Sequence, residues 1–226
     1  MAFQIIYEDE DLVVINKPSG IMVHKTSITE DKVFILQLLR NQVGKRLYPV
    51  HRLDRGTSGV LLFATSGKVA GLIQKQFREK QVLKKYTAIV RGFLPEQGTI
   101  DSPLKNGDGS FSEARTDYIP LKKTEKPYSI SRYPTSRYSL LEIYPLSGKF
   151  HQIRRHLAHI RHPVIGDKKH GDCKHNKYFT QEFGLSRMLL HANMLHIIHP
   201  VTEEKMVLMA DYDPDFNRFL QLLELG

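Results

Sequence analysis

Cysteine is scarce in this sequence of 226 residues, because Cys173 is the only one. A single thiol excludes an internal disulfide framework and a zinc site made of cysteines alone, and it favours a reducing compartment. The sequence also lacks a basic leader followed by an apolar stretch, and no hydrophobic run approaches the roughly 18 residues of a membrane span. We therefore expect a cytoplasmic protein with no membrane association.

Acidic residues are fewer than basic ones, and the two kinds are unevenly distributed along the chain. There are 33 Lys and Arg against 24 Asp and Glu, a formal charge of +9. Residues 1–11 and 201–226 each carry a charge of −4, so residues 12–200 hold 31 bases against 14 acids, a charge of +17. A basic excess of this size indicates a polyanionic partner such as nucleic acid.

Internal repeats and Ser/Gly-rich linkers are absent as well, so we expect one domain over residues 1–226. Long strand-like stretches joined by turns, with few helices between them, predict an α+β fold with a central, mostly antiparallel mixed sheet flanked by helices and loops. The expected elements are strands over 5–7 and 12–15, a helix over 30–43, a buried strand over 60–64, a helix after Ser66, strands within 82–143, a helix over 150–161, strands over 188–198 and 206–209, and a short C-terminal helix.

Local signals define the first two helices. Ser27 and Glu30 have the spacing of a capping box, and Gly44 is a typical helix terminator. Ser66 is the expected N-cap of the second helix. The buried side of that helix is predicted to carry Val69, Leu72, Ile73 and Phe77.

The most informative segment is HRLDRGTSGVLLFA at residues 51–64, where Asp54 lies between two arginines and precedes an apolar strand. The residues alone leave two interpretations open. Asp54 either anchors a turn through backbone hydrogen bonds or is a catalytic carboxylate kept ionised by the neighbouring guanidinium groups. A third interpretation, with Ser58 as a hydrolase nucleophile, is disfavoured because GTSG lacks the G-x-S-x-G spacing of a nucleophile elbow.

The string HRLDRGTSGVLL closely resembles the signature of the RluA-type pseudouridine synthases. Four more segments resemble motifs of that family in the same order: NKPSGIMVH at 16–24, LKKYTAIVRG at 83–92, SGKFHQIRRHLAHIRHPVIGDKKHG at 147–171 and LLHA at 189–192. Residues 131–172 are most similar to the small branch that modifies the uridine at position 65 of tRNA. Gly56 is a departure from that branch, which more often has proline there, and it predicts a less rigid catalytic loop.

The resemblance implies roles for four residues. Asp54 is the catalytic carboxylate, and Arg52 fills the space left when the uridine leaves its stack. Tyr86 stacks on the extracted base and is a candidate for moving a proton, and Arg154 is the active-site arginine. The predicted RNA contacts are Arg52, Arg55, Lys17, Lys85, Arg155, Lys168 and Lys169.

The same resemblance implies a reaction that needs no cofactor and no metal. The expected protein is a monomer that acts on tRNA, a single catalytic domain with two lobes around an RNA-binding cleft and no separate N-terminal RNA-binding domain. Three alternatives remain open: a ribosomal-RNA synthase of the same family, an inactive RNA-binding module that helps tRNA to fold, and a carboxylate-based hydrolase.

Helical spacing adds local support for Arg154. Ile153, Leu157 and Ile160 form an apolar stripe, and Arg154 lies one residue beside it, at the border between buried and wet surface. A charge at that border needs a buried partner, for which we predict Asp54.

Histidines and bases are concentrated between residues 149 and 177. The histidines suggest zinc, but the interleaved bases would repel a cation, so we expect a phosphate-facing surface in which some histidines are structural. These histidines are residues 151, 156, 159, 162, 170 and 175. A second basic group either extends this surface or forms an exposed, mobile loop, and it comprises Lys122, Lys123, Lys126, Arg132 and Arg137 with Tyr128, Tyr133 and Tyr138.

Overall fold

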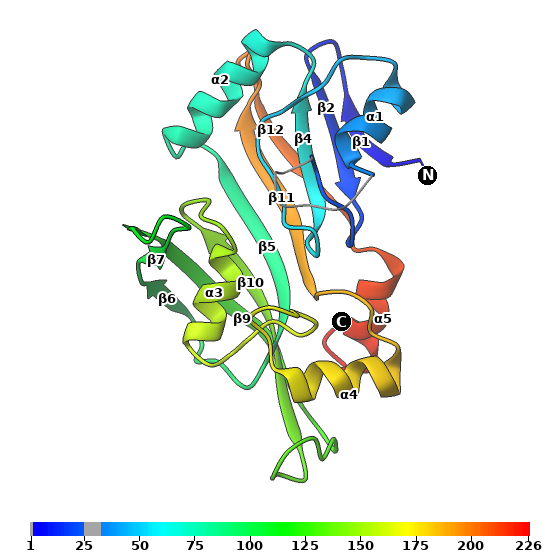
Figure 1. Cartoon of the computed structure of the whole chain (residues 1–226), viewed down its shortest axis with the longest axis vertical. Helices are drawn as coiled ribbons and strands as arrows, with labels where there is room; N and C mark the ends of the chain where they lie inside the picture. The colour runs from blue at the N-terminus through cyan, green and yellow to red at the C-terminus, as the bar shows by residue number, and fades with distance from the viewer. Residues whose placement is uncertain (1, 25–32) are drawn as a thin grey trace. The chain divides into compact units, whose positions relative to one another are not determined.

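The computed structural model describes residues 2–24 and 33–226 of the protein, in two compact units (Figure 1). The first unit comprises Met1–Lys84 with Ala192–Asp211, and the second comprises Lys85–His191 with Tyr212–Gly226. Each unit therefore combines two segments that are far apart in the sequence. No helix within the described ranges is long and apolar enough to cross a membrane.

The first unit is built on a sheet with the strand order β1-β2-β4-β11. Its ladders β1–β2, β2–β4 and β11–β12 are antiparallel, and the short β3 is paired with β4. The strands are β1 (Gln4–Glu8), β2 (Leu12–Lys17), β3 (Tyr48–Pro49), β4 (Ser58–Ala64), β11 (Leu190–Ile198) and β12 (Lys205–Met209). Every residue of β4 is buried, which confirms the central strand expected from its continuous apolar run.

Two helices lie within the described residues of the first unit. In α2 (Gly67–Arg78) the Val69 N–H donates to the Ser66 hydroxyl, so the expected N-cap is confirmed. The predicted apolar face is wrong at Leu72, which is 39% exposed, because Ala70 and Gln76 face the core instead.

The helix expected over 30–43 begins later than predicted. In the structure α1 (Ile35–Val43) starts after Phe34 in extended backbone and ends, as expected, at Gly44 in the left-handed region with φ +67°. The capping residues Ser27 and Glu30 lie outside the described residues.

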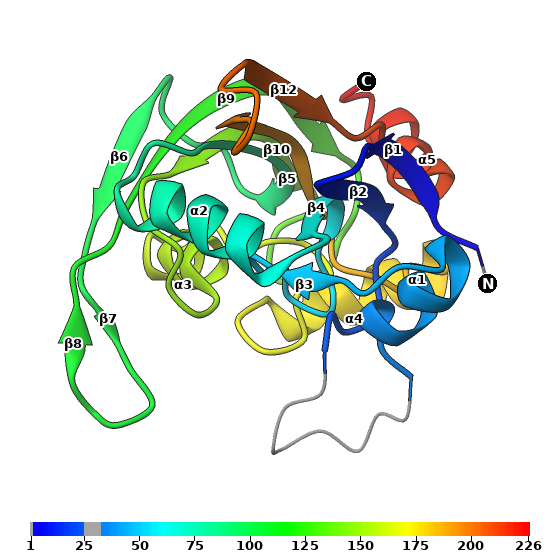
Figure 2. The same cartoon turned by 90° about the horizontal axis from the view of Figure 1, so that it is seen from above.

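The second unit carries a sheet with the order β5-β10-β9-β6, in which the three ladders are antiparallel. Its strands are β5 (Leu83–Arg91), β6 (Gly98–Asp101), β7 (Leu104–Lys105), β8 (Phe111–Ser112), β9 (Arg115–Lys126) and β10 (Ser136–Pro145). The strands β7 and β8 form a separate two-stranded hairpin, which Figure 2 shows extending beyond the end of β6. The antiparallel ladders of both units, together with the helices, confirm the α+β class.

Three helices complete the second unit: α3 (Gln152–His159), α4 (Cys173–Phe183) and α5 (Pro214–Leu222). The helix α3 packs against β9 and β10 and is shorter at both ends than the expected 150–161. The C-terminal α5 is confirmed, with Asp213 as its N-cap, whereas α4 was not predicted. Two hydrophobic cores form here: Ile153 and Leu157 of α3 lie in one, and Phe179 of α4 and Phe216 of α5 lie in the other.

Candidate active site

Asp54 lies in the first unit, in a short loop immediately before β4. The loop closes on itself because the Thr57 N–H donates to the Asp54 carbonyl at 3.1 Å. It is also bonded to residues 19 and 20: the Ser19 hydroxyl donates to the Gly56 carbonyl at 2.7 Å, and Gly20 N–H donates to the Arg55 carbonyl at 2.8 Å. The segments that resemble the first two family motifs therefore meet, and their contacts fix the backbone that carries Asp54.

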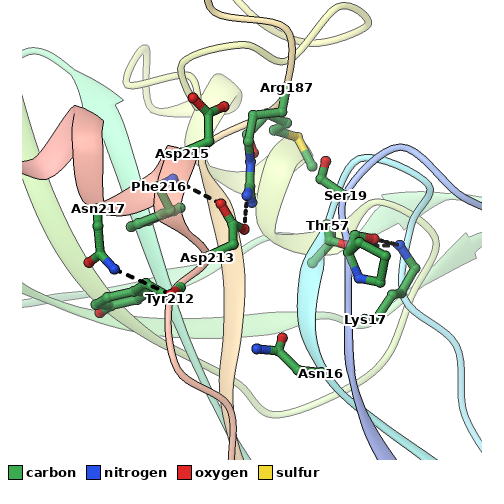
Figure 3. A network of polar contacts seen from close by, with 12 residues as sticks. Asn16, Lys17, Ser19, Thr57, Arg187, Tyr212, Asp213, Asp215, Phe216 and Asn217 are labelled. Atoms are coloured by element: carbon green, nitrogen blue, oxygen red, sulfur yellow. Dashed lines mark hydrogen bonds and ion pairs between the residues drawn. The ribbon is translucent and has the colours of Figure 1, made fainter. Parts of the chain in front are cut away.

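The Lys17 side chain holds the same loop through hydrogen bonds to backbone carbonyls. The predicted contact of Lys17 with an RNA phosphate is wrong. The side chain is fully buried, and its ammonium donates to the carbonyls of Pro18, Arg55 and Thr57 at 3.0, 3.2 and 2.8 Å. Three N–H groups thus meet three backbone acceptors, away from solvent. Figure 3 shows the Lys17 ammonium directed at this part of the chain, with Thr57 beside it.

His51 fixes the other end of the loop. Its Nε2 accepts the Leu62 N–H of β4 at 3.0 Å, and its ring stacks on Phe77 of α2 with centroids 5.3 Å apart. Burial, with a smaller contribution from the positive charge of Lys84, lowers the pKa of His51 to about 3. The imidazole is therefore neutral at physiological pH and acts as a permanent acceptor.

Two glycines allow close backbone contacts around these segments. Gly59 follows the loop with φ +111°, and a Cβ there would lie 2.1 Å from the carbonyl oxygen of Ala192 in the same unit. In the second unit Gly166 has φ +82°, and a Cβ would lie 2.0 Å from the Arg187 carbonyl oxygen. Any larger residue would push the Asp54 loop away from β11, or the turn at Asp167 away from the backbone of Arg187.

Tyr86 lies in the second unit on β5, half-buried and opposite Ile143 of β10. Its sequence neighbours are both fixed by side-chain contacts. The Lys85 ammonium pairs with Glu142 at 3.1 Å, and the Thr87 hydroxyl accepts from the Tyr212 hydroxyl at 2.9 Å. The strand position of the tyrosine is thus set on both sides, and Lys85 is engaged with a carboxylate.

Arg154 projects from α3 in the second unit and is only 8% exposed. It makes a bidentate pair with Asp167, in which Nε donates to Oδ2 at 2.8 Å and Nη2 donates to Oδ1 at 2.7 Å. Burial acts to raise the pKa of Asp167, but the hydrogen bonds from Arg154 and from the His170 N–H outweigh it and hold that pKa below its ordinary value. The predicted pairing of Arg154 with Asp54 stays a prediction.

The remaining predicted RNA contacts divide between the two units. Arg52 and Arg55 are exposed in the first unit, where the Arg55 Nε also donates to the Gly20 carbonyl at 2.9 Å. Lys168 and Lys169 are exposed in the second unit, and Arg155 is partly exposed there. The Lys85 side chain in the second unit is 27% exposed. Six of the seven predicted contacts therefore have a solvent-accessible part, in contrast to Lys17.

The histidine-rich segment of the second unit is partly structural, as expected. His156 is fully buried, with contacts to Thr116 and to the Ser102 carbonyl, and His175 is 4% exposed and contacts the Tyr138 hydroxyl. Within the described ranges, no three His, Cys, Asp or Glu side chains are grouped closely enough to hold a metal ion.

The second basic group is less exposed than the sequence suggests. Tyr138 is fully buried in a core, so it cannot stack on RNA as expected. Lys126 is 8% exposed and pairs with Glu224 at 2.7 Å, whereas Tyr133 is 57% exposed. The buried members of this group therefore support the fold.

An ion pair between a buried arginine and a partly exposed aspartate also supports the second unit near the LLHA segment. The Arg187 side chain is 7% exposed, burial lowers its pKa to about 10, and it pairs with Asp213. Asp213 also accepts the Phe216 N–H at 2.9 Å as the N-cap of α5 (Figure 3). This pair ties the chain before β11 to the start of the last helix.

Asp167, His51 and Ser19 were not predicted as supporting residues. A signal existed for Asp167, because a buried arginine needs an acid and the basic segment 149–177 contains only Asp167 and Asp172. No comparable signal identified His51 or Ser19, because each bonds to backbone groups whose positions follow from the fold.

Together, the loop geometry and the five motifs define the class of protein. The family model described as RNA pseudouridylate synthase matches residues 11–159, well over half of the chain. The chain belongs to the RNA pseudouridylate synthase family, and it is an enzyme of the isomerase type that this family name describes.

Particular relatives are similar over almost the full length. A tRNA pseudouridine synthase C from Vibrio vulnificus is 43% identical over 233 aligned residues, covering 98% of this chain and 95% of the relative, and one from Yersinia pestis is 45% identical over 222 residues, covering 93% and 86%. Among solved structures, Human RNA Pseudouridylate Synthase Domain Containing 4 has a TM-score of 0.74 at 27% identity and covers 98% of this chain and 93% of its own. A second human structure, Domain Containing 1, has a TM-score of 0.75 at 22% identity, which shows the shared fold.

Proposed function

We propose that the protein converts one uridine of tRNA into pseudouridine, at position 65. The observation that carries the proposal is the near full-length similarity, at 41–45% identity, to proteins named tRNA pseudouridine synthase C, combined with an intact HRLD loop. Ribosomal RNA is the second substrate to test, since members of the family differ in the RNA they modify.

The reaction breaks the bond between C1′ of the ribose and N1 of uracil, turns the ring and forms a bond between C1′ and C5. The proton on C5 leaves and N1 takes one up, so neither redox chemistry nor group transfer to another molecule is involved. We propose that Asp54 attacks covalently or stabilises positive charge on the sugar while the glycosidic bond breaks. The hydrogen bonds that Lys17 and Ser19 donate, and the one that His51 accepts from the Leu62 N–H, support this role because they fix the loop before substrate arrives.

The target base must leave the helix stack before its ring can turn, at a cost of a few kcal/mol. We propose that Arg52 fills the vacated space, because its guanidinium is planar and exposed. Tyr86 stacks on the extracted base, and Arg154 pairs with the Asp54 carboxylate. In this proposal Asp54 comes from one unit and Tyr86 and Arg154 come from the other, as the two lobes of one catalytic domain around an RNA-binding cleft.

Phosphate contacts are proposed for the basic residues that have a solvent-accessible part: Arg52, Arg55, Lys85, Arg155, Lys168 and Lys169. Affinity for tRNA should then fall with salt, with a log-log slope that grows by roughly 0.7–0.9 for each phosphate contacted. Replacing Lys168 with Met should remove one phosphate contact and so reduce the magnitude of that slope by roughly 0.7–0.9. A flat salt response would contradict the proposed surface.

The enzyme is further proposed to act in the cytoplasm as a monomer. Sedimentation velocity with and without tRNA tests the second point, with a single protein of 26.1 kDa bound per tRNA as the expected result. A stable dimer at assay concentrations would contradict it.

Mapping of pseudouridine in transcribed tRNA tests the main proposal. The purified protein should form pseudouridine at position 65, and Asp54→Asn should form none while binding tRNA as tightly as the wild type. Product in ribosomal RNA alone would contradict the tRNA assignment, and release of free uracil would indicate a hydrolase.

A further inference from the structure

An exposed pair of stacked rings lies at the start of α3, one helical turn before Arg154. The Phe150 ring is 57% exposed and stacks on the imidazole of His151, with centroids 3.7 Å apart and planes at 21°. His151 has left-handed backbone with φ +54° and ψ +29° at the N-cap of α3. Such backbone is unfavourable for a residue other than glycine and persists only where surrounding contacts hold it.

A second histidine supplies one of those contacts. His170 Nε2 lies 2.9 Å from His151 Nδ1, and the two rings meet edge to face at 5.2 Å. Burial is the main cause that lowers the pKa of His170, so the ring is neutral near physiological pH and the two imidazoles share a hydrogen bond without charge repulsion. The His170 ring therefore holds His151, and with it the ring stack, in place.

His170 is in turn connected to the pair of Arg154 and Asp167. The Asp167 Oδ1 that accepts from Arg154 also accepts the N–H groups of Lys169 and His170 at 2.9 and 3.1 Å. One buried carboxylate thus positions both the arginine and the turn that carries His170. The ring stack consequently has a defined place relative to Arg154, within a single unit.

One cation lies near the exposed ring, and other basic residues lie close to it in sequence. The Lys169 ammonium lies 5.6 Å from the Phe150 centroid and belongs to an exposed, flexible side chain. Lys149 and Arg155 flank the two rings along the sequence, and Lys168 precedes Lys169. An aromatic surface among cations matches an RNA strand, because a base presents a π-face while its phosphate presents negative charge.

We propose that Phe150, stacked on His151, is a binding platform for a nucleobase of the RNA substrate and that Lys169 pairs with a neighbouring phosphate. This subsite rests on the proposed function, since it assumes an RNA substrate. Stacking on an aromatic ring accepts every base, so the platform contributes affinity and position rather than sequence readout. The ring is held before RNA binds, which lowers the entropy lost on binding.

Three substitutions at one position test the platform. Phe150→Ala should raise the Kd for dye-labelled, transcribed tRNA about tenfold and raise KM in step, while kcat falls much less. Phe150→Trp should bind within about twofold of the wild type because it keeps a π-face. Phe150→Leu keeps apolar area without a π-face and should resemble Phe150→Ala.

Two results would overturn the proposal. One is a Phe150→Ala variant that binds tRNA as the wild type does, and the other is a Phe150→Leu variant that binds as tightly as Phe150→Trp. The matched control is Phe111→Ala on β8, which removes a phenylalanine that is 67% exposed in the same unit and should leave the Kd unchanged. Equal weakening by this control would also contradict a specific platform.

Failure of this subsite is distinguishable from failure of the proposed function. Absence of pseudouridine with the wild-type enzyme would contradict the tRNA synthase, whereas the binding comparison needs no turnover. Thermal unfolding by circular dichroism should show equal stability for the Phe150 variants, because the side chain is largely exposed.

Discussion

The loop that carries Asp54 and the segment that carries Arg154 are fixed by opposite charges. In the first unit a buried cation, Lys17, binds three backbone carbonyls, and in the second unit a buried carboxylate, Asp167, binds a guanidinium and two backbone N–H groups. Lys17 therefore shapes a loop, whereas Asp167 orients the Arg154 side chain. The comparison teaches that basic residues within the motifs divide into those that hold the backbone and those that are available for RNA.

The largest effect is expected when the Arg154 side chain is removed. Arg154→Ala should lower pseudouridine formation by at least about 10³-fold, about 4 kcal/mol, because the arginine is lost and Asp167 keeps a buried charge without its counter-ion. Arg155→Ala, its partly exposed neighbour, is the control and should weaken tRNA binding only a few fold. Single-turnover rates measure both, and an active Arg154→Ala variant would contradict the role given to this arginine.

Removing the charge of Asp167 tests the carboxylate itself. Asp167→Asn should lower the free energy of unfolding by about 3 kcal/mol, since it breaks a buried bidentate pair. Because the pKa of Asp167 is lowered in the folded protein, its stabilising effect is present above the ordinary aspartate pKa and is lost as pH falls through the folded value. Urea denaturation between pH 7 and pH 3 should therefore show a smaller acid loss in Asp167→Asn than in the wild type, and parallel curves would contradict the pairing.

Removing the cation tests the first segment. Lys17→Met should lower the free energy of unfolding by about 2–3 kcal/mol and should reduce activity, because three buried carbonyls lose their donor. Lys168→Met is the matched control on an exposed lysine and should change stability by less than about 0.5 kcal/mol. If Lys17→Met instead kept its stability and changed only the salt dependence of tRNA binding, Lys17 would be an RNA contact after all.

The smallest effect is expected at His51 and depends on pH. The pKa of His51 is lowered to about 3 in the folded protein, so the stability it contributes is complete above the ordinary histidine pKa of about 6.5 and decreases as pH falls below it. At pH 5 the loss is about 2 kcal/mol by this linkage. His51→Gln keeps an acceptor for the Leu62 N–H without titrating, so its unfolding free energy should change less than the wild-type value between pH 6.5 and pH 5.

Much of the fold followed from local sequence. The continuous apolar run 60–64 predicted a strand buried on both faces, as β4 is, and Ser66 and Gly44 occupy the helix ends that their chemistry favours. The helix α4 was missed because its buried side is carried by His175 and Phe179 among lysines, a pattern that was interpreted as wet surface. His175 is buried because its ring contacts the hydroxyl of Tyr138, a strand residue distant in sequence.

The candidate site was also predictable only in part, because some of its contacts join residues that are distant in sequence. Literal motifs predicted roles for Asp54, Tyr86 and Arg154, and these roles stay predictions. The surroundings of the Lys17 ammonium depended on the carbonyls of Arg55 and Thr57, about forty residues away. A sequence states that a lysine is charged, but only the fold decides whether backbone oxygens or solvent surround its ammonium.

Release of tritium from tRNA labelled at C5 of uridine tests the central claim most directly, because the isomerisation must remove that hydrogen. The wild-type enzyme should release one tritium per tRNA from a transcript with uridine at position 65, and none when that uridine is replaced by cytidine. Equal release from both transcripts, or no release from either, would contradict a tRNA pseudouridine synthase acting at position 65.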